Sequence, residues 1–271
     1  MFRIEAPSVA DLTAFHSAGY IVFPAVLTDK GIAGLTDEIL SHEQVIDFLS
    51  KTDAEHSKLS KPYRLSVRNW NNKGPWSDQL FDAPLVLTLL RAAIGEDFHF
   101  CHSTLAVSLR GARAINFHQD HHHWKHNTPV NLDEREKWYI QMLYYPNGFK
   151  RGDANLLVIP GSHRVAPTDD ATPEKLLQGE YNEQVGQELQ VEYLEAPPGS
   201  MVFLNARTFH AVEPKPKDSP QKYRLFVNYI FKEAGPPHLH TQAIPPEWMH
   251  GASPERRKMF QREPYSPERW C

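Results

Sequence analysis

The feature that most constrains this chain is a change of texture near residue 98, where short apolar segments rich in β-branched and aromatic residues begin. The segments are FHFCHSTLAVSLR (98–110), WYIQMLYYP (138–146), NLLVIP (155–160), QVEYLEA (190–196), SMVFLNA (200–206) and RLFVNYIF (224–231). Proline, glycine and asparagine separate them, and these residues favour turns. Many short strands punctuated in this way predict a mainly β fold, an antiparallel sandwich or barrel.

The first 97 residues are mostly helical in pattern. The predicted helices cover 9–18, 32–40 with a continuation to 50, and 83–95. Ser8 and Gly19 flank the first of these as an N-cap and a stop signal, and Gly95 ends the last. The polar stretch 50–80, which contains Asn69, predicts a long functional loop.

We predict a single domain over 1–271, with the strands of 98–232 as its core. The closing stretch 233–271 contains seven of the 22 prolines and predicts an extended tail with one short helix near 254–261. No internal repeat or low-complexity segment interrupts this organisation.

Composition excludes several classes of protein. A hydrophobic fraction of 41% over 271 residues is enough for a proper core, which excludes a disordered chain. A net charge of -4 argues against a nucleic-acid surface, and no apolar run is long enough to cross a bilayer. The N-terminus lacks the pattern of a secretory signal, and the two cysteines are far apart. These features predict a cytoplasmic protein; the oligomeric state stays open.

Among 15 histidines, His118 stands in the sequence Asn-Phe-His-Gln-Asp, two residues before Asp120. Two residues apart on an extended segment point to the same face, so the pair can ligate one metal. By itself the pair is also compatible with a surface turn. A distant third ligand changes this, because His210 follows the apolar segment 200–206. Two histidines and one carboxylate form the facial triad of non-heme iron and leave three positions open.

Arg224 opens the strand that follows His210. A planar guanidinium can bind a carboxylate with two parallel hydrogen bonds, which suits the far end of a 2-oxo diacid bound at the metal. Without that context, Arg224 is interpreted as an ordinary edge-strand arginine.

Taken in order, four segments resemble the phytanoyl-CoA dioxygenase-like (PhyH) family. They are FHSAGYIVFPAVLT (15–28), HQD (118–120), LLVIPGSHR (156–164) and PPGSMVFLNARTFHAVEP (197–214), and a basic strand follows the last. The resemblance covers about residues 12–232. It implies a double-stranded β-helix, a jelly-roll of the cupin kind with helices packed on it, whose mouth holds iron.

The resemblance implies a role for each matching residue. His118, Asp120 and His210 would bind Fe(II), and Arg224 would hold the C5 carboxylate of 2-oxoglutarate. The resemblance also suggests two further donors to this co-substrate, Asn116 and Gln141, although both are compatible with ordinary strand side chains. Two departures stand out: Val212 occupies a position where relatives can have a hydroxyl, and the spacing from His210 to Arg224 is stretched.

The activity implied is hydroxylation of an unactivated carbon, with O2 and 2-oxoglutarate converted to CO2 and succinate. The rivals are a metal-dependent cupin-type isomerase and a non-catalytic jelly-roll binding protein. The segment 121–126 contains four histidines and Lys125 and reads either as substrate contacts or as a solvated loop. Together with Arg64, Arg68 and Asn69, it predicts a small, polar or anionic substrate. His163, within Gly-Ser-His-Arg, reads as a structural residue whose ring bonds local backbone.

Overall fold

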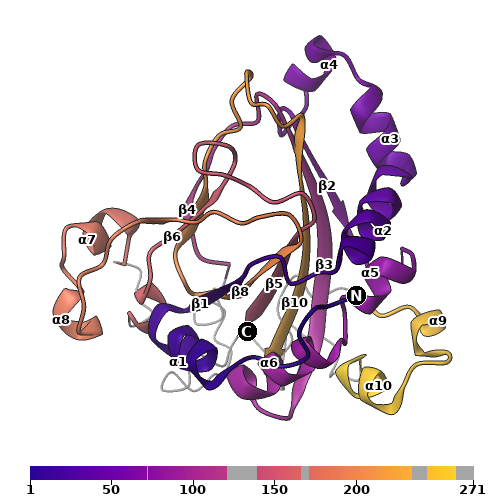
Figure 1. Ribbon diagram of the computed structural model, residues 1–271. Helices are drawn as coiled ribbons and strands as arrows, with labels where there is room; N and C mark the ends of the chain where they lie inside the picture. The colour runs from indigo at the N-terminus through magenta and orange to yellow at the C-terminus, as the bar shows by residue number, and fades with distance from the viewer. Residues whose placement is uncertain (72, 121–138, 166–170, 234–242, 261–271) are drawn as a thin grey trace, which may run out of the picture.

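Figure 1 shows a computed structural model of the chain, which describes residues 1–71, 73–120, 139–165, 171–233 and 243–260. The strands are β1 Tyr20–Phe23, β2 Arg64–Arg68, β3 Phe98–Leu109, β4 Ile115–His118, β5 Ile140–Tyr145, β6 Leu156–Val158, β7 Glu192–Tyr193, β8 Ser200–Asn205, β9 His210–Val212 and β10 Tyr223–Glu233. They form a six-stranded antiparallel sheet in the order β1-β8-β5-β10-β3-β2 and a four-stranded sheet in the order β4-β9-β6-β7.

From β3 onward the chain passes back and forth between the two sheets, which is how a jelly-roll is connected. Apolar side chains from both sheets meet between them. Leu143, Val202 and Leu204 come from the large sheet, and Val158 and Val212 come from the small one. The predicted jelly-roll core is therefore confirmed.

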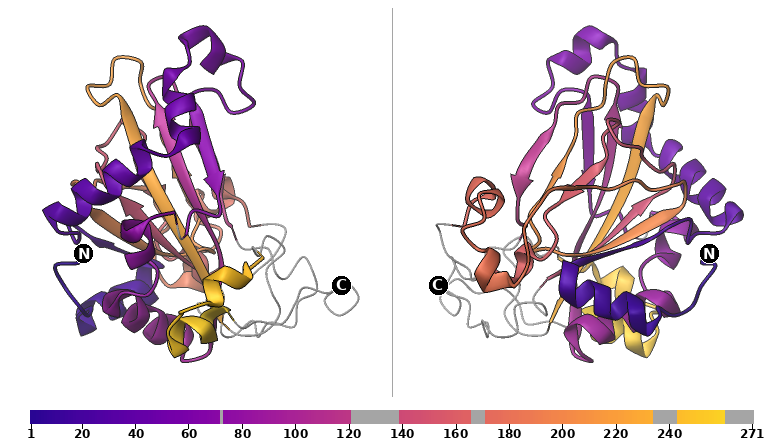
Figure 2. Two further views of the ribbon diagram at one scale, coloured as in Figure 1. Left: turned by 90° about the vertical axis from the view of Figure 1, so that its right-hand side faces the viewer. Right: turned by 60° about the vertical axis from the view of Figure 1, so that its left-hand side comes forward.

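Helices surround this core. They are α1 Val9–Ala18, α2 Asp29–Leu40, α3 Glu43–Ser50, α4 Asp53–Ser57, α5 Pro75–Gln79, α6 Pro84–Ile94, α7 Pro173–Leu177, α8 Asn182–Val185, α9 Pro246–Met249 and α10 Pro254–Phe260, with a 3-10 turn η3 at Ser162–Arg164. Figures 1 and 2 show α2, α5, α6 and α10 along the outer side of the large sheet, and α7 and α8 beyond the small sheet. Among the described residues, no helix has the length and apolar character that a membrane span requires.

The outer side of the large sheet is the larger core of the molecule. Every second residue of β10 contributes to it, namely Leu225, Val227, Tyr229 and Phe231, all 0% exposed. The seven buried residues of α6 pack against this face. Alternation along one strand thus places apolar side chains on the outer face and leaves the other positions for the interior of the jelly-roll.

The N-terminal part differs from its mostly helical prediction in contributing two strands to the large sheet. β1 pairs with β8, and β2 pairs with β3. The predicted loop at 50–80 is wrong, because it contains α4, β2 and α5. The continuous helix predicted from 32 to 50 is interrupted at His42, which leaves helical conformation and packs its ring on buried Trp70 at 5.1 Å between centroids.

The first helix agrees with its sequence signals. Ser8 accepts a hydrogen bond from the Asp11 amide and forms a capping box with it. Gly19 ends the helix with φ 85°, a conformation that favours glycine, and β1 begins at the next residue. The short helix predicted near 254–261 is α10.

Candidate metal centre

The two ends of the ligand set come from neighbouring strands. His118 is the last residue of β4, His210 is the first residue of β9, and the two are paired directly in the antiparallel ladder. Their rings lie 4.3 Å apart between centroids. Asp120 follows two residues after His118, and its amide donates to the Ala206 carbonyl. Nitrogen and oxygen donors of these three residues all lie within 4.8 Å of one another.

Both imidazoles are oriented by backbone carbonyls. Nδ1 of His118 lies 2.8 Å from the Asn116 carbonyl oxygen, and Nδ1 of His210 lies 2.9 Å from that of Thr208. A carbonyl oxygen can only accept, so each Nδ1 donates and each Nε2 is left to act as the ligand. The two Nε2 atoms lie 3.7 and 3.4 Å from the Asp120 carboxylate.

The carboxylate is held in its ionised form. Burial raises the pKa of Asp120, but hydrogen bonding and charge from His210, then the charge of His118 and a hydrogen bond from Gln141, outweigh it and lower that pKa. In return, Asp120 raises the pKa of His210 against the effect of that ring's burial. A positive charge at this point is therefore favourable, as a proton or as a metal ion. Two imidazole nitrogens and an ionised carboxylate fit Fe(II).

A hydrogen-bonded chain supports Asp120 from the large sheet. Gln141, on β5 and 2% exposed, donates from Nε2 to Oδ2 of Asp120 at 2.6 Å. Asn228, on β10, donates from Nδ2 to Oε1 of Gln141 at 2.7 Å. The sequence predicts Gln141 as a donor to the co-substrate, and that role stays a prediction; the contact the structure shows is to the carboxylate ligand. Asn228 was missed, although it is the one amide in the apolar segment RLFVNYIF.

Arg224 lies on the same inner face of β10 as Asn228, four residues away. At the rise of a β-strand, this places their Cα atoms about 13 Å apart. Arg224 is buried, donates from Nη1 to the Ala154 carbonyl and lies over the ring of Tyr145 at 5.7 Å. The sequence predicts that Arg224 holds the C5 carboxylate of 2-oxoglutarate, and that role stays a prediction.

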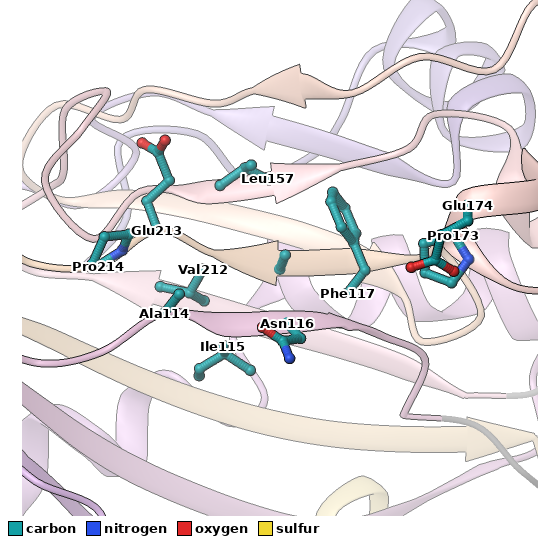
Figure 3. Close-up of a pocket in the computed structure, with 11 residues that line it drawn as sticks. Ala114, Ile115, Asn116, Phe117, Leu157, Pro173, Glu174, Val212, Glu213 and Pro214 are labelled. Atoms are coloured by element: carbon teal, nitrogen blue, oxygen red, sulfur yellow. The ribbon is translucent and has the colours of Figure 1, made fainter. Parts of the chain in front are cut away.

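Asn116 is exposed at β4, and its described hydrogen bond is the one its carbonyl accepts from His118. It lines a groove of about 520 Å³ between β4, β9 and the start of α7, shown in Figure 3. Phe117, Leu157 and Glu174 also line this groove, and the three metal-site residues do not. The donor role predicted for Asn116 stays a prediction.

The remaining histidine predictions divide in two. His163 is buried, and its Nε2 lies 3.2 Å from the His16 carbonyl oxygen at the end of α1. The ring thus bonds backbone far away in the sequence, where local backbone was expected. The histidines of 121–126 lie outside the described residues.

Comparison with known proteins identifies the family of the chain. The sequence model of the Phytanoyl-CoA dioxygenase (PhyH) family matches residues 15–217. The chain belongs to this family. The match includes all three candidate ligands, and membership of the PhyH family indicates a 2-oxoglutarate-dependent oxygenase. No protein with a curated description is significantly similar in sequence.

Solved structures agree with the PhyH assignment at the level of the fold. EvdMO1 matches with a TM-score of 0.59 and 17% identity over 83% of this chain and 49% of that one, so the chain spans about half the length of EvdMO1. EctD from S. alaskensis, solved with bound Fe, matches with a TM-score of 0.63 and 18% identity over 86% and 79% of the two chains. SnoK, a carbocyclase from nogalamycin biosynthesis, matches with a TM-score of 0.61 and 15% identity over 84% and 85%.

Proposed function

We propose that this protein is an Fe(II)- and 2-oxoglutarate-dependent dioxygenase that hydroxylates a small polar metabolite. The observation that carries the proposal is the convergence of two carbonyl-oriented imidazoles and an ionised carboxylate on one point at the mouth of a jelly-roll. Iron bound there would supply the activation of O2 and the removal of hydrogen from an unactivated carbon.

The protein's own residues supply orientation and exclusion of water. His118 and His210 present Nε2, and Gln141 fixes the rotation of the Asp120 carboxylate through one oxygen. His210 is 7% exposed, whereas the side chains of His118 and Asp120 are 36% and 40% exposed. The centre is thus closed on the side of the jelly-roll interior and open on the side of β4, where we place substrate entry.

Arg224 is proposed to bind the C5 carboxylate of 2-oxoglutarate. Its burial beside Tyr145 and Phe226 makes a charged hydrogen bond there stronger than it would be in water. Neither Lys217 nor Lys222 competes for this role from within the core, because both are exposed.

Hydroxylation is proposed because Asp120 occupies the position whose carboxylate related halogenases lack. SnoK is described as an α-ketoglutarate-dependent carbocyclase, so ring formation is the competing outcome on this fold. A polar substrate is proposed because β2 presents Ser66 and Arg68 beside Thr104 on the inner face of the large sheet. EctD has been solved with 2-oxoglutarate and 5-hydroxyectoine, a small polar compound.

The deciding experiment follows iron content and succinate formation in purified protein under anaerobic loading and then air. We expect one Fe(II) per chain, slow succinate formation alone and faster formation with polar or anionic metabolites. A cupin-type isomerase would hold metal without consuming 2-oxoglutarate, and a binding module would do neither. Strong stimulation by long-chain acyl-CoAs alone would refute the polar substrate.

A further inference from the structure

Arg224 is a buried cation on the inner face of β10. It is 4% exposed, and within the described part of the chain it takes part in no ion pair. Among the described residues its Nε has no hydrogen-bond partner, while Nη1 donates to the Ala154 carbonyl. A buried charge is normally paired because the loss of hydration is costly. The environment of Arg224 therefore favours the binding of an anion beside it.

A second guanidinium, that of Arg64, lies on the same face of the large sheet as Arg224. Arg64, the first residue of β2, is paired with Ser108 of β3, and Ser108 is paired with Arg224 of β10. Directly paired residues project to the same face of a sheet, so these three side chains form one row. Two strand spacings separate the outer members by about 10 Å between Cα atoms, a gap that two extended guanidinium groups and one carboxylate can fill.

The two arginines repel each other in this position. Burial, and after it the charge of Arg224, lower the pKa of Arg64 to about 10. Arg64 donates from Nε to Oγ of Ser108 at 3.2 Å and from Nη2 to the Arg113 carbonyl at 3.0 Å, both neutral acceptors. The nearby carboxylate, Asp153, is engaged by Lys215 at 2.6 Å. The two guanidinium groups thus lie on either side of buried Ser108, and the acceptors of their hydrogen bonds are neutral.

On the opposite sheet, the position two residues after His210 is apolar. Val212, two residues after His210, packs with Phe226 and Ile115 in the apolar cluster between the sheets. A hydroxyl group is present instead on the large sheet, at Ser108, with Arg64 directly beyond it.

We infer that Arg64 is a second binding residue for the distal carboxylate of 2-oxoglutarate, which it grips together with Arg224 across Ser108. The inference rests on the proposed function and adds to it a residue from β2, outside the jelly-roll strands. Two guanidinium forks can saturate the lone pairs of one carboxylate, and the anion would relieve the repulsion between them.

The test compares Arg64 with a neighbouring arginine. Arg113 is exposed between β3 and β4, and its backbone carbonyl accepts the hydrogen bond from Arg64. Arg64→Gln and Arg113→Gln each remove one positive charge next to the same contact, and Arg113→Gln keeps that carbonyl. Binding of 2-oxoglutarate to Fe(II)-loaded protein is measured by calorimetry without oxygen. 2-Oxobutyrate, which has the 2-oxo acid but no distal carboxylate, serves as the second probe.

We expect Arg64→Gln to weaken 2-oxoglutarate binding about tenfold or more, because removal of one charged partner from a buried pair typically costs more than a factor of ten, and to leave 2-oxobutyrate binding unchanged. Arg113→Gln should change neither. Equal loss for both acids, or no loss for 2-oxoglutarate, would overturn the inference and leave the proposed function standing. If the unmodified protein binds no 2-oxoglutarate, the proposed function fails first and the inference fails with it.

The melting temperature without ligand separates a binding role from a structural one. If Arg64 only ties β2 to the backbone at Arg113, its loss lowers that temperature. If it completes an anion site, removal relieves repulsion with Arg224, so the melting temperature is kept or rises while the stabilisation by added 2-oxoglutarate falls. Arg64→Lys, which keeps charge but not the fork, should give intermediate affinity.

Discussion

The two faces of the large sheet are formed by alternate residues of the same strands and differ in chemistry: the outer face is mainly apolar, and the inner face contains the polar groups of the candidate site. On β10, Leu225 and its outward neighbours are fully buried against helices, while Arg224 and Asn228 point between the sheets. The outer face contains apolar side chains and two tyrosines, Tyr144 and Tyr229, whose hydroxyls donate to backbone carbonyls. The inner face contains the amide chain to Asp120 and the arginine row. A shift of one residue in register would exchange the two sets.

This division explains how a costly interior is tolerated. Buried amides and guanidinium groups contribute little net stability and cost more when a partner is missing. The outer face offsets that cost by burying aliphatic and aromatic area, and its tyrosine hydroxyls are hydrogen-bonded. Substitutions on the inner face should therefore change ligand affinity and leave the fold intact. Substitutions on the outer face should lower the free energy of unfolding and leave ligand affinity unchanged.

The largest effect is expected for His210→Ala. Removing a direct ligand should weaken Fe(II) binding by more than about 100-fold, since residues that only support a ligand already account for 10–100-fold. Succinate formation should disappear while far-UV circular dichroism stays unchanged. His56→Gln, at an equally buried histidine of α4, is the matched control. Full turnover by the alanine variant would remove His210 from the centre.

Leu225→Ala tests the outer face. Leu225 is 0% exposed, so its truncation leaves a cavity and should lower the free energy of unfolding by about 2–5 kcal/mol. Urea unfolding measures this loss. The affinity of the remaining native protein for Fe(II) and 2-oxoglutarate should be unchanged, and a selective loss of affinity would show that the two faces are not independent.

Arg224→Ala tests the inner face at the residue next to Leu225. It should weaken 2-oxoglutarate binding by about 2–5 kcal/mol, the range for truncating one member of a buried charged pair, with Fe(II) affinity close to normal. Without ligand, the free energy of unfolding should fall less than in Leu225→Ala, because the guanidinium of Arg224 forms no ion pair among the described residues. Unchanged affinity for 2-oxoglutarate would transfer the carboxylate site to another cation.

The sequence predicts the features that depend on local residue patterns or on the spacing of residues. The strands after residue 98, the cap at Ser8 and the separation of His118 from Asp120 are all local signals. It missed what depends on distant pairing. Whether Arg64 lies in a loop or in a strand beside Arg224 is decided by the register of β2 on β3, which polar residues at 50–80 do not encode. Asn228 likewise acquires a role only because Gln141 lies on the adjacent strand.

The smallest predicted effect lies where the two sheets meet α1, at His163. This ring is buried; its Nε2 donates to the His16 carbonyl, and its Nδ1 has no hydrogen-bond partner in the described part of the chain. Burial, helped by the charges of Arg164 and Arg207, lowers the pKa of His163 from 6.5 to about 3. Between these values the unfolded chain takes up a proton that the folded protein does not, so stability is lost as pH falls below 6.5.

For a group of this kind, the loss between pH 6.5 and pH 5 is about 1.5 kcal/mol. His163→Gln keeps a donor for the His16 carbonyl but cannot titrate, so its free energy of unfolding should fall less over this interval, by about that amount. Urea unfolding at the two pH values measures the difference. His16→Gln, at an exposed ring whose backbone carbonyl is retained, should follow the unmodified protein. Equal losses in His163→Gln and the unmodified protein would mean that another group titrates, and that the buried ring at this junction is protonated or solvated in the native state.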